Sequence, residues 1–243
     1  MQRPNAFPPQ GQIPANAHQT QNPFASLDGQ SYDKPHAALK DRPLDMFYVC
    51  FFLMHIPATL LLDLQAVYPP SLLPKWMHAL GHMYMEFTAD PVVGSVNGYF
   101  GEHVKQNFAW LRMFMFSELL IQLPIFFYAS YSFYSISSST TPSTSPIPTL
   151  YPLLIAYGAL TATTTLPCIG VLLSTPSTSV PLDFSSSVAG PAVTEWQRWL
   201  LLGSYIPFFL IPLGIAVDMI FRTRFLTRKG VWVVQKGMLS KWE

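Results

Sequence analysis

Four long apolar runs, separated by polar segments, set the pattern of the chain. A helix needs about 20 predominantly apolar residues to cross a bilayer. The runs that meet this length cover residues 44–67, 108–134, 150–173 and 199–221. Each run contains at least one proline, which membrane helices tolerate and which commonly marks a kink. The pattern therefore predicts an all-α membrane protein built as a four-transmembrane-helix bundle.

The segments between and beyond the runs have different characters. Residues 1–42 are rich in Gln, Asn, Pro and Ala, which predicts a disordered tail. The stretch 68–107 instead carries large apolar residues at helical spacing, which predicts one or two short helices on one face of the bundle. Residues 43–226 would then form the membrane domain. Residues 227–243 would form a C-terminal tail that either lies on the membrane surface or is solvated.

Composition and charge support this assignment and orient the bundle. Only 11% of the residues are charged, whereas soluble domains carry about 25%. Of the 14 basic residues, ten fall on the side of both termini and four on the opposite side. Short segments rich in Lys and Arg stay cytosolic, so both termini are expected in the cytosol and the short helices in the lumen. The net charge of +1 gives no indication of nucleic-acid binding.

Two acids, Asp63 and Glu118, lie within the first and second apolar runs. A carboxylate at the centre of a membrane helix costs roughly 2.5–3.5 kcal/mol, so it usually faces a partner or a cavity. Each lies about six residues, or about 9 Å, from the same end of its helix. Antiparallel neighbouring helices would therefore bring the two acids to one depth. They would either line a pocket or only lock the two helices together.

A pocket with both acids has a definite chemistry. Repulsion and burial would leave one acid protonated and the other ionised. Such a pair suits a cationic amine, and the protonated acid could donate a hydrogen bond to a hydroxyl such as that of a sterol. Gln122 lies one turn beyond Glu118, and His55 lies two turns before Asp63. For His55, a pocket role and a buried structural role both stay open.

The remaining polar residues indicate structure rather than chemistry. Asp90 precedes Pro91 and is expected to cap or pin the loop against the bundle. Asp218, one turn before Arg222, is expected to form an ion pair. His78 and His82 have a spacing that could bind zinc, but no further ligand accompanies them. No metal site, cofactor site or catalytic motif is predicted.

Several segments resemble one known family. Residues 55–69 (HIPATLLLDLQAVYP), 86–93 (EFTADPVV) and 110–127 (WLRMFMFSELLIQLPIFF) are similar to the EXPERA-domain transmembrane family, that of the animal sigma-2 receptor. Residues 157–167 and 205–212 extend the resemblance to about residues 43–226. The Gln- and Pro-rich first segment suits a fungal member, of the kind associated with efficient mitochondrial targeting.

The resemblance implies the EXPERA fold, with lumenal short helices, in the endoplasmic reticulum membrane. It implies a ligand pocket for sterols, oxysterols or cationic amphiphiles and a structural role for Asp90. The implied pocket residues are Asp63, Glu118, Gln122, His55, Tyr157, Thr164, Tyr205 and Phe208. Phe208 stands where the animal receptor has a tyrosine, so ligand preference would differ there. The C-terminus lacks a clear dilysine signal, which puts retention by that route in doubt.

The resemblance leaves three functions open. The first is a non-catalytic protein of sterol homeostasis, with a sterol-transport partner and a homodimeric state. The second is a sterol Δ8–Δ7 isomerase, which uses separated acid and base groups; the isomerases carry a histidine where this chain has Thr59. The third is a quality-control factor for mitochondrial precursors at the reticulum surface.

Overall fold

A computed structural model describes residues 38–136, 147–182, 184 and 190–239 of the chain. Four helical segments in this part are long and apolar enough to cross a membrane, which confirms the predicted fold class. Residues 1–37 of the predicted disordered tail lie outside the described residues. The elements in chain order are η1 (Leu39–Asp41), α2 (Pro43–Leu61), η2 (Asp63–Ala66), η3 (Pro70–Leu72), α3 (Lys75–Thr88), α4 (Pro91–Asn97), α5 (Glu102–Asn107), α6 (Ala109–Ser117), η4 (Glu118–Gln122), α7 (Leu123–Ser135), α8 (Ile147–Ser174) and α9 (Glu195–Leu239).

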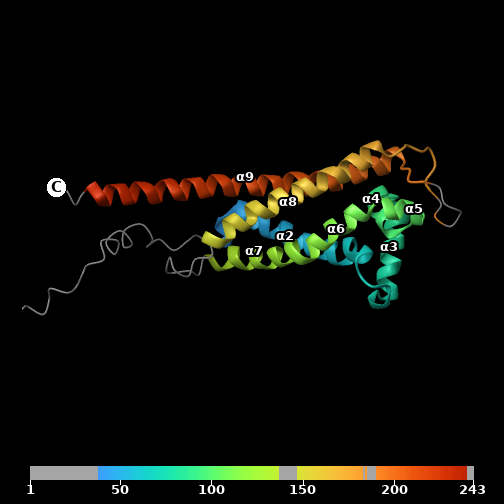
Figure 1. Ribbon diagram of the computed structural model, residues 1–243, viewed down its shortest axis with the longest axis horizontal. Helices are drawn as coiled ribbons and strands as arrows, with labels where there is room; N and C mark the ends of the chain where they lie inside the picture. Colours follow the sequence, from blue (N-terminus) through green and yellow to red (C-terminus); the bar gives the residue numbers. More distant parts are fainter. Residues whose placement is uncertain (1–37, 137–146, 183, 185–189, 240–243) are drawn as a thin grey trace, which may run out of the picture.

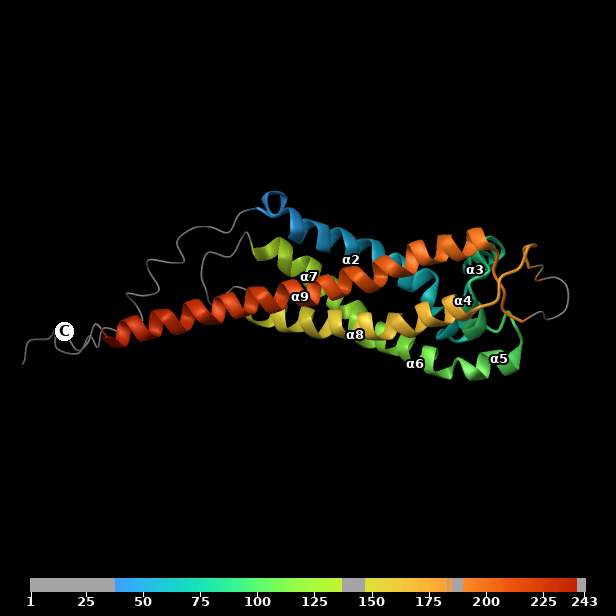
Figure 2. The ribbon, with the colours of Figure 1, turned by 90° about the horizontal axis from the view of Figure 1, so that it is seen from above.

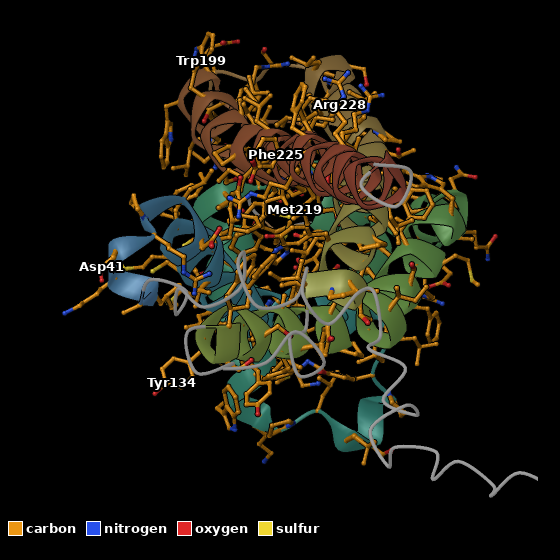
Figure 3. The ribbon with its side chains drawn as sticks, turned by 90° about the vertical axis from the view of Figure 1, so that its left-hand side faces the viewer. Asp41, Tyr134, Trp199, Met219, Phe225 and Arg228 are labelled. Carbon is orange, nitrogen blue, oxygen red and sulfur yellow. The ribbon has the colours of Figure 1, made fainter. Side chains whose placement is uncertain are left out.

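The four spans run side by side along the long axis of the molecule (Figures 1 and 2). At one end, the terminal end, α2 and α8 begin, α7 ends and α9 leaves the bundle. At the other, the loop end, α3, α4 and α5 gather. The hydrophobic core between the spans centres on the fully buried rings of Phe52, Phe126 and Tyr157. Seen from the terminal end, α9 lies across the other spans and Met219 points to the middle of the bundle (Figure 3).

Helices α8 and α9 are packed backbone against backbone. A Cβ atom on Gly158 of α8 would lie 2.2 Å from the carbonyl oxygen of Pro212 in α9. Only glycine allows this approach, as small residues do at many membrane-helix interfaces. Arg198, in the first turn of α9, donates hydrogen bonds to the carbonyls of Leu172 and Leu173. These bonds satisfy carbonyls that the end of α8 leaves free.

The first span ends earlier than predicted. Its α-helix stops at Leu61 rather than at residue 67, and Asp63 opens the 3-10 turn η2. The amide of Gln65 turns back and donates to the carbonyl of Leu61 at 2.6 Å and to that of Met77 at 3.1 Å. A side chain that caps the last turn competes with helix continuation. Asp63 therefore lies just beyond the span and not inside a regular helix.

The second span runs from Ala109 to Ser135, close to the predicted range, but it is not a uniform α-helix. Residues Glu118–Gln122 form the π-helical turn η4, which ends two residues before Pro124. Proline lacks a backbone N–H, so the turn that precedes it loses an α-helical hydrogen bond. Single π turns in α-helices occur frequently at functional sites. Here the turn carries both Glu118 and Gln122.

The loop end holds three short helices, α3, α4 and α5, where the sequence predicted one or two. The helix pattern of residues 76–87 corresponds to α3. Glycines account for the break between α4 and α5. Gly98 (φ 88°) ends α4 and Gly101 (φ 95°) precedes α5, and both have the positive φ that glycine adopts without strain.

Helix α9 continues beyond the membrane domain as a single helix to Leu239. The sequence left two alternatives for residues 227–243, a surface-lying segment or a solvated tail. Up to Leu239 this segment is a helix that runs on in line with its span past the terminal end (Figure 1). The 17 residues after Arg222 extend it by about 25 Å.

A group of charged residues joins the spans at the terminal end. Arg222 of α9 pairs with Asp218 at 2.8 Å, which is the ion pair predicted from the sequence, and with Asp45 of α2 at 2.7 Å. Arg42 also pairs with Asp45, at 2.8 Å, and donates to a carbonyl of α7. Tyr48 donates to Asp218 at 3.1 Å. We call these five residues the ion cluster.

Candidate functional site

A cavity of about 260 Å³ lies inside the loop-end half of the bundle. All four spans and the turns between them contribute side chains to its wall. Its lining consists of His55, Ala58, Leu62, Asp63, Tyr84, Val92, Val93, Leu111, Phe114, Met115, Glu118, Gln122, Thr161, Thr164, Thr165, Cys168, Ser204, Tyr205 and Phe208. Most of the surface of the wall is apolar, and its polar groups converge on one space, the usual character of a small-molecule site.

The structure brings Asp63 and Glu118 to this one cavity, from η2 and η4 respectively. It also brings His55, Gln122, Thr164, Tyr205 and Phe208 to the same wall. The sequence and the resemblance placed eight residues together, and these seven are all of them except Tyr157. Both acids therefore line one cavity and are not enclosed in solid packing between two helices.

Glu118 is held by two side chains of the first span. Thr59 of α2 donates its hydroxyl to Glu118 Oε1 at 2.5 Å, and His55 Nε2 lies 3.5 Å from the same oxygen. Thr59 is fully buried, so this hydrogen bond is shielded from water. His55 is clamped in turn between aromatic rings, stacked on Phe126 at 4.8 Å and tilted against Phe208 at 4.6 Å. The position of the Glu118 carboxylate is thus fixed from α2.

Asp63 has a different environment. Within the described part of the chain, no donor group forms a hydrogen bond or ion pair with its carboxylate. Burial raises the pKa of Asp63 well above the usual aspartate range, and the nearby charges of Glu118 and Asp90 raise it further. An unpaired acid that faces a cavity is poised to take a ligand group that satisfies it.

Gln122 and Thr161 form a polar boundary of the cavity. Thr161 of α8 donates to Gln122 Oε1 at 2.7 Å, and both side chains are buried. Tyr157 lies one turn from Thr161 toward the terminal end, which places it outside the cavity wall. The structure puts its ring in the core, edge-on to Phe52 and Phe126. The resemblance implied Tyr157 as a pocket residue, and the structure does not bring it there.

Asp90 lies behind the cavity wall and organises the loop end. Its Oδ1 accepts from the amides of Val92 and Val93, which caps the start of α4. Its Oδ2 accepts the hydroxyls of Tyr84 at 2.6 Å and Tyr205 at 2.9 Å. Burial raises the pKa of Asp90, and these four donors lower it in part. One buried carboxylate therefore ties together α3, α4 and α9, and it orients two tyrosines of the cavity wall.

Sequence reasoning missed several wall residues. Thr161, Thr165 and Cys168 lie on α8 with Thr164. Counted from Thr161, the four residues stand at i, i+3, i+4 and i+7, which places their side chains on one helix face. This polar stripe in an apolar span was a signal that could have found them. Tyr84 of α3 gave no such signal, because only the folded loop end turns it toward the spans. Among the described residues, no group of acids, histidines and cysteines could hold a metal ion.

Comparisons with known proteins agree with the geometry. Residues 76–219 match the family described as EXPERA, the expanded EBP superfamily. The chain is 31% identical to sigma intracellular receptor 2 of Xenopus tropicalis over 76% of this chain and 92% of that protein. It is 32% identical to the Homo sapiens protein of the same name, over 70% of this chain and 83% of that protein. Efficient mitochondria targeting-associated protein 19 of Saccharomyces cerevisiae is 29% identical, over 70% of this chain and 93% of its own length.

Proposed function

This chain belongs to the EXPERA superfamily, and from this premise we propose that it binds sterols, oxysterols or cationic amphiphiles without transforming them. The observation that carries the proposal is the Asp63 carboxylate, which faces an otherwise largely apolar cavity without a hydrogen-bond donor among the described residues. A protonated amine, or the hydroxyl of a sterol, supplies the donor that Asp63 lacks. Tyr205, Thr164 and Gln122 offer further polar contacts, and Phe208 and His55 an aromatic wall.

The volume of the cavity narrows the mode of binding. Sites for drug-sized ligands span about 300–1,000 Å³, and this cavity of about 260 Å³ lies just below that range. We infer that the cavity takes the polar head and the adjoining rings of an amphiphile. The rest of the ligand would extend out between the spans. There it would lie against the apolar surface that the spans present to the bilayer.

A labelling experiment tests this function. The purified protein in lipid nanodiscs is exposed to a photoreactive cationic amphiphile and to a photoreactive sterol, and the labelled peptides are identified by mass spectrometry. We expect labelling of cavity-wall segments in the wild type and a loss of amine labelling of at least tenfold in Asp63→Asn. The exposed acid Glu102 provides the matched control, because Glu102→Gln removes the same charge away from the cavity. Equal amine labelling in the wild type and Asp63→Asn would contradict the proposal.

Isomerase activity is the alternative within the superfamily, and one feature favours it. His55 and Glu118 form a dyad beside the cavity, and such dyads perform general acid–base catalysis. Against it, Glu118 is already bonded to Thr59 and His55 is clamped by aromatic rings. Incubation of the purified protein with a Δ8 sterol distinguishes the two. Formation of the Δ7 product, lost in Glu118→Gln, would establish the enzyme; an unchanged sterol supports binding alone.

The name of the yeast relative favours a further role in mitochondrial targeting. In this reading the protein lies in the endoplasmic reticulum membrane with both termini in the cytosol. It contacts a sterol-transport protein, a second copy of itself or mitochondrial precursors there. Crosslinking from the terminal end, in the wild type and in Asp63→Asn, tests whether the cavity senses lipid for this purpose. If the substitution leaves partner capture unchanged, lipid binding in the cavity and partner binding are separate roles.

A further inference from the structure

Helix α3 divides its surface into three faces rather than two. Successive residues of an α-helix are rotated by about 100°, so residues three, four, seven and eleven apart share a face. One face packs on the rest of the protein and comprises Met77, Gly81, Met85 and Thr88. A second, polar face comprises Lys75, His78, His82 and Glu86. The third comprises Trp76, Leu80, Met83 and Phe87, which we call the apolar strip.

The apolar strip is exposed although its side chains are large. Trp76, Met83 and Phe87 are 59%, 61% and 58% exposed. An amphipathic helix of a soluble protein buries its apolar residues against the core. In α3, a separate set of residues already makes that contact. A contiguous exposed apolar surface of this kind marks an interaction site.

The place of α3 in the molecule identifies what covers the strip. The helix runs across the bundle axis at the loop end, where the spans begin and end (Figures 1 and 2). Phe87 lies edge-on to Trp196 in the first turn of α9, with ring centroids 5.2 Å apart, and Trp199 is exposed on the next turn. Aromatic residues at the ends of spans gather at the membrane–water interface. The strip therefore continues an aromatic belt.

We propose that α3 is an interfacial helix whose apolar strip inserts into the lipid leaflet at the loop end. Its three faces match the three surroundings that meet there, with the packed face toward the protein, the strip toward hydrocarbon and the polar face toward water. A protein partner would leave unexplained why a polar face flanks the strip along the whole helix. The lipid leaflet explains both exposed faces at once.

The placement of α3 also sets the depth of one part of the cavity wall. Tyr84, on the same helix, lines the cavity and bonds to Asp90, and Gln197 of α9 donates to the carbonyl of Phe87 at 3.1 Å. Because these contacts fix α3 to the spans, the cavity wall at Tyr84 lies close to the depth of the lipid headgroups. The acid-bearing end of the cavity would thus face the level at which amphiphiles carry their polar groups.

Spin labelling tests the depth of α3. In a cysteine-free background (Cys50→Ala, Cys168→Ala), single cysteines replace Met83 on the strip and His78 on the polar face. Each variant is labelled, reconstituted in phosphatidylcholine vesicles and probed with oxygen, which concentrates in hydrocarbon, and with a water-soluble nickel chelate. We expect the label at 83 to be relaxed mainly by oxygen and the label at 78 mainly by nickel.

Two results would overturn the proposal. Nickel access at both positions would place the strip in water, and shielding of position 83 from both reagents would show that protein covers it. A second measurement uses native residues alone. Brominated phosphatidylcholine should quench less tryptophan fluorescence in Trp76→Phe than in the wild type. An equal quenched intensity in both would also contradict insertion.

Discussion

Asp63 and Glu118 share a cavity but have opposite surroundings. Glu118 receives the hydroxyl of Thr59 and lies beside His55, so its carboxylate is already engaged. Asp63 receives no hydrogen bond within the described residues, and burial raises its pKa. The pair thus divides into a fixed acid, which shapes the wall, and a free acid, which is available to a ligand. This division could not be seen in the sequence, where both acids occupy equivalent depths.

The raised pKa of Asp63 predicts a pH dependence for amine binding. A carboxyl with an elevated pKa takes up its proton at a higher pH than the ordinary value of about 3.9, and the neutral form does not attract a cation. Affinity for an amine that stays protonated throughout should therefore fall as the pH decreases, and the fall should begin at a higher pH than an ordinary carboxyl would give. Scintillation-proximity binding measures this. In Asp63→Asn the affinity should be low at every pH, and a wild-type profile that stays flat would contradict the assignment.

For the helices, the sequence predicted which membrane spans exist better than it predicted where they end. The apolar runs located all four spans because the bilayer imposes a length on each helix. The end of α2 was misplaced because the Gln65 side chain, and not a change in hydropathy, stops the helix at Leu61. The π turn at Glu118 was likewise invisible, since it depends on how the span accommodates Pro124. Both acids nevertheless line one cavity, because a few residues of error in helix length leave them near the same end of the bundle.

The contact between α8 and α9 predicts a specific sensitivity to substitution. Gly158→Ala places a methyl group against the backbone of Pro212, which cannot yield as a side-chain tip could. Overpacking of this kind costs about 1–3 kcal/mol. Thermal unfolding in detergent should show a clear decrease in Tm for Gly158→Ala. Gly170→Ala is the control, because its methyl group meets no atom within 4 Å and alanine favours the helix. Equal Tm values for the two variants would contradict the close packing.

The molecule as a whole is fastened at its two ends by different means. At the loop end, Asp90 gathers α3, α4 and α9 through neutral donors. At the terminal end, the ion cluster joins α2 and α9, and Arg42 extends it to a carbonyl of α7. The cavity lies in the half between the core aromatics and the loop end. A ligand could therefore be admitted by movement in that half while the terminal end stays closed.

The ion cluster should be the most sensitive electrostatic element of the fold. Asp45 bridges Arg42 and Arg222, and its side chain is 5% exposed. Asp45→Asn would leave two arginines without their common partner, and breaking a buried pair in this way costs about 3–5 kcal/mol. We expect a large decrease in thermal stability in detergent. The exposed pair of Glu102 and Lys105 supplies the control, because Glu102→Gln should cost at most about 1 kcal/mol. Comparable losses in both variants would mean that the cluster does not fasten the spans.

The most direct test of the account is a structure of the protein in a lipid nanodisc with a cationic amphiphile bound. We predict that the ligand nitrogen lies about 2.7–2.9 Å from a carboxylate oxygen of Asp63, the distance of a charge-assisted hydrogen bond. The hydroxyl of Thr59 should remain bonded to Glu118 in the same structure. A ligand seated elsewhere, or one in the cavity whose nitrogen contacts Glu118 while Asp63 stays unpaired, would contradict the account.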